Sequence, residues 1–230
     1  MPVRCITFDL DDTLWSVDDV MARAEQAFYA WVSDHYPRIT ESFSPQALVT
    51  HRRAYAGQFP ELRHDFTELR QRWLAHLAER FAYGPELVEE GFRVYWEQRN
   101  AVRLFEPVPA VLAELAARYS LGTITNGNAD VHYIGIGHHF DFVMTAARAG
   151  VPKPEAGIFH AALEQAGMTP DVAVHVGDDP HLDVGGAQGV GMRTVWVNAA
   201  ARPWPGGPPP DAEVRHLGEL GSVLAAWADD

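Results

Sequence analysis

Two aspartates at the end of a short apolar run are the first residues whose types and spacing could do chemistry. The run Val3–Phe8 predicts a buried strand, and Asp9 and Asp11 follow it directly. Close carboxylates repel each other unless a cation compensates, and a hard divalent ion such as Mg²⁺ takes oxygen ligands of this kind. An ordinary acidic turn into a helix, capped by Asp12 or Thr13, is the competing interpretation, and this pair alone does not decide between the two.

A second acidic group follows another apolar run. Val172–Val176 leads into Gly177-Asp178-Asp179, and Asp183 opens the next predicted helix. Ligands of doubly wound sheets bind beyond the carboxyl ends of the strands, which is where Asp9 and Asp178 would meet. Asp183 also suits a purely structural role, because a carboxylate at a helix start is stabilised by the helix dipole. Two strands that each end in carboxylates predict a binding site more strongly than either does alone.

Polar and basic groups complete the pattern. Thr125 and Asn126 end a third apolar run, and the turn past them can present backbone N–H groups to a phosphate oxygen, although Asn-Gly is also an ordinary turn signal. Lys153 lies between two prolines and is the only lysine beside 17 arginines. A general preference of the chain for arginine over lysine would explain why it has so many arginines and only one lysine. We interpret the exception as a site where a compact charge fits and the planar arginine fork does not.

Several other catalytic signatures are absent from the sequence. It has no Gly-x-x-x-x-Gly-Lys-Ser/Thr and no Gly-x-Ser-x-Gly, which excludes a P-loop nucleoside triphosphatase and an α/β-hydrolase nucleophile elbow. Gly135-Ile-Gly137 follows no predicted strand and lacks the third glycine of a dinucleotide site. The 11 histidines are scattered, and we predict that His138, His139 and His175 are surface or packing residues rather than ligands.

Alternating strands and helices must position these groups. Four apolar runs predict buried strands: Val3–Phe8, Leu121–Thr125, Val172–Val176 and Thr194–Val197. Three segments between them have helical spacing: Val108–Tyr119, Glu155–Ala166 and Leu182–Gly189. This alternation predicts an α/β fold, a Rossmann-like parallel sheet covered by helices on both faces. The proline-rich stretch 202–210 predicts a surface connection to a last strand and a helix over Leu217–Trp227.

The stretch from residue 17 to residue 102 has a different pattern. Four segments show helical spacing with no convincing strand between them: Asp18–Tyr36, Pro45–Gln58, His64–Tyr83 and Pro85–Arg99. Short segments near 15–17 and 102–105 are suited to be hinges. We therefore predict two domains, a Rossmann-like catalytic core of residues 1–16 and 103–230 and an inserted all-α, four-helix cap of residues 17–102.

Composition and charge limit the class of protein. The 230 residues are 47% hydrophobic and 21% charged, as in an ordinary globular protein, and Cys5 is the only cysteine, so an intramolecular disulfide is excluded. A net charge of -13 disfavours binding to nucleic acid or to anionic lipid. No secretory leader or membrane span is predicted. We expect a soluble, cytoplasmic protein whose partner is a small molecule, while the oligomeric state is not readable.

Taken in order, the four polar groups resemble the motifs of the haloacid dehalogenase superfamily. Asp9-x-Asp11-x-Thr13 resembles the first motif, and Thr125-Asn126-Gly127 resembles the second. Lys153 stands at the third motif, and Gly177-Asp178-x4-Asp183 stands at the fourth. The resemblance covers essentially the whole chain, since the helical insertion is similar to the small C1-type cap of that superfamily.

The resemblance implies a catalytic role for each acidic group. Asp9 would attack phosphorus and form an aspartyl-phosphate, and Asp11 would protonate the leaving alcohol and then activate water. Mg²⁺ would be held by Asp9, by the backbone carbonyl of Asp11 and by Asp178.

The resemblance also implies how a phosphate would be bound. Thr125, the backbone N–H of Asn126 and Lys153 would hold the phosphoryl oxygens. Asp183 would orient Lys153 or a metal-bound water, and the cap would close over the substrate and choose the leaving group.

Within this superfamily, Asp11 separates two chemistries. Dehalogenases attack carbon, expel a halide that needs no proton, and lack an aspartate at that place, whereas a phosphate ester expels an oxygen that an acid must protonate. We therefore expect a Mg²⁺-dependent phosphatase of a small phosphomonoester. A 2-haloacid dehalogenase and a non-catalytic binding protein on the same scaffold are the alternatives. Thr125–Ala129 and His175–Asp179 are similar to bacterial phosphatases of flavin mononucleotide and of a riboflavin-pathway intermediate, which makes such compounds candidate substrates.

Overall fold

Six short strands, rich in apolar and β-branched residues, form the sheet of the core. The computed structural model describes residues 2–228, and its strands are β1 (Cys5–Phe8), β2 (Ser120–Thr125), β3 (Phe142–Thr145), β4 (Ala173–Gly177), β5 (Arg193–Val197) and β6 (Ala212–Val214). Their order is β3-β2-β1-β4-β5-β6, and every neighbouring pair is parallel. The predicted α/β class with a Rossmann-like parallel sheet is confirmed.

The strand order places β1 between β2 and β4. Phe8 of β1 pairs with Thr123 of β2 on one side and with Val176 of β4 on the other. The backbone N–H of Asp9 then donates to the carbonyl oxygen of Val176 over 2.9 Å. Because all three strands run the same way, the residues that follow them leave the sheet at one edge.

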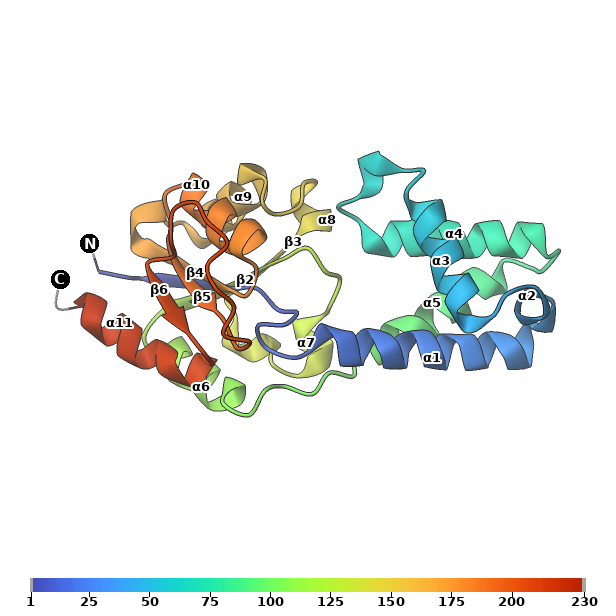
Figure 1. The fold of residues 1–230 in the computed structure, drawn as a ribbon, viewed down its shortest axis with the longest axis horizontal. Helices are drawn as coiled ribbons and strands as arrows, with labels where there is room; N and C mark the ends of the chain where they lie inside the picture. Colours follow the sequence, from blue (N-terminus) through green and yellow to red (C-terminus); the bar gives the residue numbers. More distant parts are fainter. Residues whose placement is uncertain (1, 229–230) are drawn as a thin grey trace. The chain divides into compact units, whose positions relative to one another are not determined.

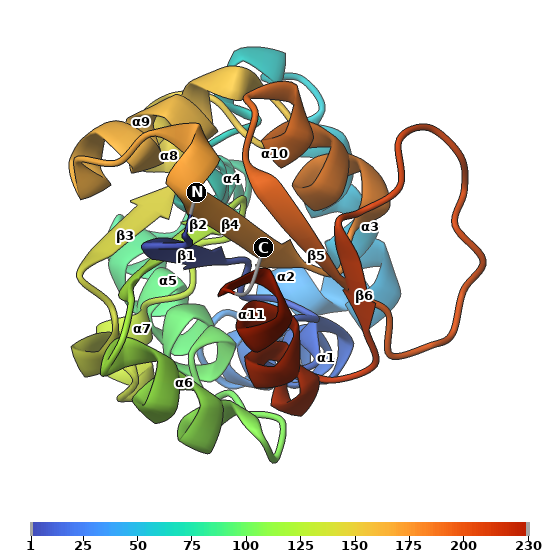
Figure 2. The same cartoon turned by 90° about the vertical axis from the view of Figure 1, so that its left-hand side faces the viewer.

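Helices cover both faces of this sheet (Figure 2). On one face lie α8 (Ala146–Ala149), α9 (Ala156–Ala166) and α10 (Gly186–Gly189), and on the other lie α6 (Val108–Ala116), α7 (Val131–Ile134) and α11 (Leu220–Ala228). Helix α9 buries one apolar stripe, formed by Ile158, Phe159, Ala162 and Leu163, together with sheet residues such as Ile124 and Phe142. The sequence spacing of α9 therefore dictates which of its faces covers the sheet.

Several elements of this unit differ from the sequence prediction, and the short helices α7 and α8 are among those that are not predicted. Strand β3 is not predicted, because four residues that alternate between buried and half-buried positions make too short a pattern. The helix predicted over Leu182–Gly189 is instead a π-helical turn, Pro180–Gly185, followed by the short α10. The carboxylate of Asp179 caps that turn by accepting from the N–H groups of His181 and Leu182, both over 2.8 Å.

Residues 17–102 form a helical unit of their own. The chain divides into two compact units, one of Met1–Ser16 with Arg103–Asp230 and the other of Val17–Val102. The helical unit contains α1 (Val17–His35), α2 (Pro37–Ser42), α3 (Pro45–Ala56), α4 (Phe66–Arg80) and α5 (Glu86–Arg99), as Figure 1 shows. The prediction of four helices is wrong, because the six-residue α2 is too short to show a period and begins at a proline.

An aromatic and aliphatic core holds the helical unit together. Helices α1 and α5 lie side by side (Figure 1), and Phe28, Trp73 and Leu74 are almost completely buried between α1 and α4. The rings of Phe28 and Trp73 lie 5.8 Å apart. No helix formed by residues 2–228 has both the length and the apolar character to cross a bilayer.

Cys5 gives a direct chemical test of the sheet core. The side chain lies in β1 with no exposed surface, and burial, with the nearby charge of Asp141, raises the pKa of its thiol to about 12. Because the thiolate is the reactive form, we expect iodoacetamide at pH 8 to leave native Cys5 unmodified for hours and to label it rapidly in denaturant. Mass spectrometry reports the label, and rapid labelling of the folded protein would contradict this packing.

Candidate active site

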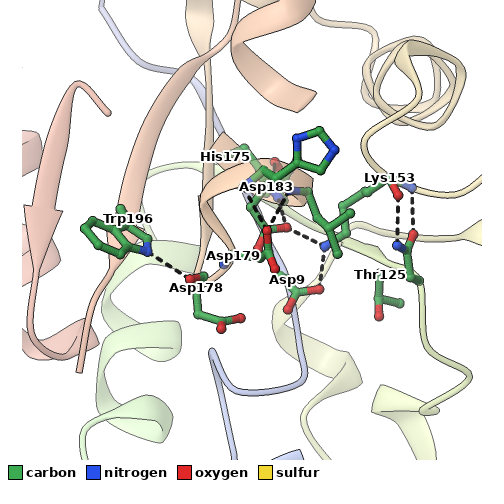
Figure 3. A network of polar contacts seen from close by, with 12 residues as sticks. Asp9, Thr125, Lys153, His175, Asp178, Asp179, Asp183 and Trp196 are labelled. Carbon is green, nitrogen blue, oxygen red and sulfur yellow. Dashed lines mark hydrogen bonds and ion pairs between the residues drawn. The ribbon is translucent and has the colours of Figure 1, made fainter. Parts of the chain in front are cut away.

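Side chains from distant parts of the sequence meet at the carboxyl edge of the sheet (Figure 3). Asp9 follows β1 and Asp178 follows β4, whereas Lys153 comes from the loop before α9 and Asp183 from the π-helical turn. Oxygens of Asp9, Asp178 and Asp183 all lie within 4.8 Å of one another. The structure thus gathers four of the seven site residues predicted from the sequence into a single cluster.

Lys153 is the cation at the centre of this cluster. Its ammonium group donates to Asp9 Oδ1 over 2.5 Å and to Asp183 Oδ1 over 2.6 Å, and the side chain is almost fully buried. Burial alone would lower the pKa of Lys153, but the two carboxylates outweigh it and hold that pKa above its usual value. Lys153 therefore remains charged and fixes both carboxylates at short distances.

Asn126 holds the backbone that carries this lysine. Its side-chain Nδ2 donates to the carbonyl oxygen of Lys153 over 3.1 Å, and its Oδ1 accepts from the backbone N–H of Lys153 over 2.7 Å. The resemblance to the haloacid dehalogenase motifs implies a role only for the backbone N–H of Asn126, in phosphate binding. The structure adds a second role, because the amide side chain ties the end of β2 to the loop before α9.

Both carboxylate oxygens of Asp183 accept hydrogen bonds. Its Oδ1 accepts from Lys153 and from Nε2 of His175, and its Oδ2 accepts from the backbone N–H of Asp179 over 2.9 Å. Burial favours its neutral acid, yet Lys153 and the hydrogen bond from His175 hold the pKa of Asp183 below its usual value. Gly177 permits this approach, since a Cβ there would lie 2.3 Å from the Asp183 carboxyl carbon.

His175 contacts Asp183, a role at the site that its position in the sequence does not predict. It is buried in β4, its Nδ1 lies 2.9 Å from the Thr7 hydroxyl, and its Nε2 lies 3.1 Å from Asp183 Oδ1. Burial lowers the pKa of His175, and because a carboxylate only accepts, Nε2 carries the proton of the hydrogen bond to Asp183. It is a packing residue, as predicted, but one that also aims Asp183. A histidine inside an otherwise apolar strand is the sequence feature that indicates such a role, because a buried imidazole needs hydrogen-bond partners.

Asp178 is positioned from the far side by β5 and the loop after it. Its backbone carbonyl accepts from Trp196 Nε1 over 2.8 Å and from Arg202 Nη2 over 3.0 Å. The same Arg202 nitrogen lies 4.0 Å from Asp178 Oδ2. The proline-rich stretch is therefore more than a surface connection, because its first residue, Arg202, reaches the site.

Asp11 lies beside the cluster rather than in it. Its Oδ1 accepts from Trp15 Nε1 over 2.9 Å, and the indole is completely buried. The turn between them places Asp12 in the left-handed region (φ 60°), a conformation that aspartate tolerates better than most residues. This turn holds the Asp11 carboxylate two residues from Asp9, at the same edge of the sheet.

Thr125 ends β2 at this edge and is also buried. Its Oγ1 accepts from the backbone N–H of Gly127 over 2.9 Å, which leaves its own O–H proton as a donor. Figure 3 shows its side chain on the same side of the sheet as Asp9 and Lys153. It is thus placed where an incoming oxyanion could accept from it.

The charge of the cluster is suited to a divalent cation. Burial raises the pKa of Asp9 well above its usual value, against the opposing effect of Lys153. Burial also raises the pKa of Asp178, to about 7, and the charges of Asp183 and Asp12 add to this effect. With three carboxylates close together and one lysine among them, negative charge is in excess. Oxygen ligands of this kind fit Mg²⁺, and a bound ion would lower both pKa values.

The geometry defines what the site can do chemically. Asp9 is a carboxylate whose position is set by a short bond to Lys153. Asp11 is a second carboxylate at the same edge, and Thr125 supplies a hydroxyl donor. A nucleophile, a nearby acid or base and donors for an oxyanion are the components of covalent substitution at a phosphoryl or carbon centre.

Sequence comparison finds relatives along nearly the whole chain. A family model described as haloacid dehalogenase-like hydrolase matches residues 3–191. The chain is 30% identical over 230 residues to the 5-amino-6-(5-phospho-D-ribitylamino)uracil phosphatase YigB of Escherichia coli (strain K12), and the match covers 96% of each. It is 33% identical over 173 residues to a phosphoserine phosphatase of Thermus thermophilus, covering 73% of this chain and 66% of that protein.

Structural comparison finds a similar fold in a protein that is named for a different activity. The crystal structure of a 2-haloacid dehalogenase from Pseudomonas syringae pv. Tomato DC3000 has a TM-score of 0.92 and 37% sequence identity. The match covers 98% of this chain and 99% of that one.

Proposed function

The chain belongs to the haloacid dehalogenase-like hydrolase family, and from that premise we propose that it is a Mg²⁺-dependent phosphatase of small phosphomonoesters. The observation that carries the proposal is the position of Lys153, bonded to both Asp9 and Asp183 beside Asp178. The lysine orients the nucleophile and stays charged, so it is available to a phosphoryl oxygen. The named phosphatases among the relatives support the same reaction class.

In the proposed first step, a carboxylate oxygen of Asp9 bonds to phosphorus while the bond between phosphorus and the ester oxygen breaks. Asp11, held by the Trp15 indole, gives its proton to the departing oxygen, so that an alcohol leaves and an aspartyl-phosphate remains. Lys153 and the Thr125 hydroxyl donate to the phosphoryl oxygens during this transfer.

In the second step, water attacks the phosphorus of the aspartyl-phosphate, and Asp11 accepts its proton. Inorganic phosphate leaves, and the Asp9 carboxylate is restored. Asp183 acts through Lys153, because its oxygens accept from that lysine, from His175 and from the backbone of Asp179.

Three groups would hold the metal ion. These are the carboxylates of Asp9 and Asp178 and the backbone carbonyl of Asp11. When bound, Mg²⁺ would neutralise phosphoryl charge and reduce the repulsion between an anionic substrate and Asp9.

We propose a small phosphate ester, rather than nucleic acid or a membrane, as the partner of this site. The net charge of -13 opposes a polyanion, and the name of the YigB relative describes a phosphorylated ribitylamino compound. Sugar-alcohol phosphates attached to a flat heterocycle, among them flavin mononucleotide, are therefore the first substrates to examine.

A substrate panel with and without metal tests the proposal. We expect phosphate release from one or more of 5-amino-6-(5-phospho-D-ribitylamino)uracil, flavin mononucleotide, phosphoserine and sugar phosphates. EDTA should abolish the release, and excess Mg²⁺ should restore it. No phosphate release from any ester in the presence of Mg²⁺ would favour a non-catalytic binding protein.

A 2-haloacid dehalogenase is the second candidate, because the Pseudomonas syringae structure is similar over nearly the whole chain. Halide release from 2-chloropropionate, measured beside phosphate release, separates the two reactions. Asp11 favours the phosphatase, since expulsion of a halide needs no acid.

Replacing Lys153 with arginine should impair the enzyme although it keeps the charge. The ammonium group sits between two carboxylates at 2.5 and 2.6 Å, where a planar guanidinium would have to displace one of them. We expect kcat/KM for the best phosphate ester to fall at least about tenfold, with a folded circular dichroism spectrum. Wild-type kinetics in this variant would contradict the argument that only a compact cation fits.

Trp196 should set the metal affinity of Asp178. Trp196→Phe removes the indole donor that holds the Asp178 backbone carbonyl, so the carboxylate loses orientation. Outer hydrogen bonds of this kind are worth about 10–100-fold in metal affinity, and isothermal titration with Mg²⁺ should show about a tenfold loss. Trp227→Phe is the matched control, because Trp227 lies on α11 against Arg193, at the start of β5 and away from Asp178. Equal Mg²⁺ affinity in both variants would show that Trp196 does not contribute to metal binding.

A further inference from the structure

The helical unit has a cavity of its own. It measures about 730 Å³, lies between α1 and α3, and is lined only by residues of these two helices. That volume falls within the range of roughly 300–1,000 Å³ that is usual for small-molecule sites. Part of its wall is apolar, formed by the half-buried Met21, Tyr29 and Val49. The cavity is therefore large enough for a ligand with an apolar body.

A charged cluster forms the polar part of the wall. Glu25 and Arg52 both line the cavity, and Arg52 Nη2 donates to Glu25 Oε1 over 2.9 Å. Nη2 of the buried Arg70 bonds to the same carboxylate oxygen. Arg53 and Asp18 also line the cavity, both exposed and of opposite charge. Two guanidinium groups thus share one carboxylate, and one positive charge is left without an equal partner.

Arg70 cannot swing away to relieve this excess. Its side chain is only 3% exposed, and its guanidinium lies over the ring of Tyr95, with 3.2 Å between the guanidinium carbon and the ring centroid. Because Arg70 stays on Glu25, that carboxylate cannot fully neutralise Arg52.

The cluster also has more donors than acceptors. Arg52 Nε and Arg70 Nη1 are both buried, and neither has a hydrogen-bond partner within residues 2–228. Burial lowers the pKa of Arg52, and the charge of Arg70 lowers it further. The negative charge of an anion in the cavity would oppose this lowering of the Arg52 pKa, and its oxygens would accept from the arginine that lines the wall.

We propose that this cavity is a binding site for a small organic oxyanion, a carboxylate or a phosphate on an apolar body, with Arg52 as its main polar contact. The planar guanidinium matches the paired oxygens of either group. Met21, Tyr29 and Val49 would contact the apolar body. Arg70 acts through Glu25, because it competes for that carboxylate and leaves Arg52 available. All the residues that line the site belong to the helical unit.

Isothermal titration of the full chain tests the proposal with two probes, 2-naphthoate for the carboxylate and phenylphosphonate for a phosphate that cannot be hydrolysed. We expect saturable one-to-one binding of at least one probe, and the tighter probe identifies the oxyanion. Arg52→Gln should weaken binding at least about tenfold. Arg72→Gln is the matched control in the same unit, because Arg72 pairs with Glu68 on the surface of α4.

A second variant should strengthen binding of the probe rather than weaken it. Glu25→Gln removes the competing carboxylate, so binding should tighten severalfold, which a merely structural role for the cluster would not produce. Circular dichroism verifies the fold of each variant. The proposal is overturned if neither probe binds below about 10 mM, if Arg52→Gln binds as tightly as wild type, or if Lys153→Arg abolishes the binding, which would place the probe at the core site instead. None of these readouts depends on turnover, so they are independent of the phosphatase assignment.

Discussion

Asp9→Asn is expected to reduce phosphate release to below about 1% of wild type. The amide has nearly the same size as the carboxylate and can still accept from Lys153, whose ammonium lies 2.5 Å from Asp9 Oδ1. It is, however, a much poorer nucleophile towards phosphorus, so the aspartyl-phosphate should not form. The measurements are kcat on the best ester of the panel and, by mass spectrometry, the trapped phosphoryl group on wild type and variant.

The same variant should fold at least as stably as wild type. Burial raises the pKa of Asp9, so its charged form is less favourable in the folded than in the unfolded protein. Ionised Asp9 therefore destabilises the metal-free fold at pH values above its unfolded pKa, and the neutral amide removes that effect. The melting temperature without metal should stay the same or rise. Residual turnover above about 1% would refute Asp9 as the nucleophile.

Asp141→Asn is a suitable control for this substitution. Asp141 is an exposed aspartate that accepts from the Ser120 hydroxyl over 2.7 Å at the start of β2, away from the carboxyl edge of the sheet. The same chemical change there should leave kcat unaltered.

Asp11→Asn should lower kcat by about 10²-fold or more for esters of alkyl alcohols, because no group is left to protonate the departing oxygen. The variant removes the carboxyl proton of residue 11 but keeps its side chain in the same position. In the wild type, the Trp15 indole donates to Asp11 Oδ1 over 2.9 Å, and an asparagine Oδ1 can still accept this hydrogen bond. Esters of p-nitrophenol, whose leaving group needs little protonation, should lose less in the first step.

Two results would contradict this role for Asp11. An unchanged kcat with alkyl esters would show that Asp11 is not the general acid. Halide release that survives Asp11→Asn while phosphate release is absent in both proteins would favour the dehalogenase reaction over the phosphatase.

Much of the core fold follows from local pattern. β1, β2 and β4 are predicted because each is a short run rich in apolar and β-branched residues, as is typical of strands buried on both faces. β3 and α2 escape prediction because four or six residues are too few to show a period. The π-helical turn at Pro180–Gly185 escapes it as well, since Asp179 and Asp183 shape that turn through their side chains.

The amino-acid order by itself determined which acidic groups follow strands β1 and β4 and, because parallel strands end at one edge, that these groups lie near each other. Only the tertiary structure decided what each group touches. Lys153 is 144 residues from Asp9 in the sequence, and Trp196 is 18 from Asp178, so no spacing rule predicts either contact. Local sequence sets the direction of a strand, but the bonds of a buried side chain depend on which other segments the packing brings within reach.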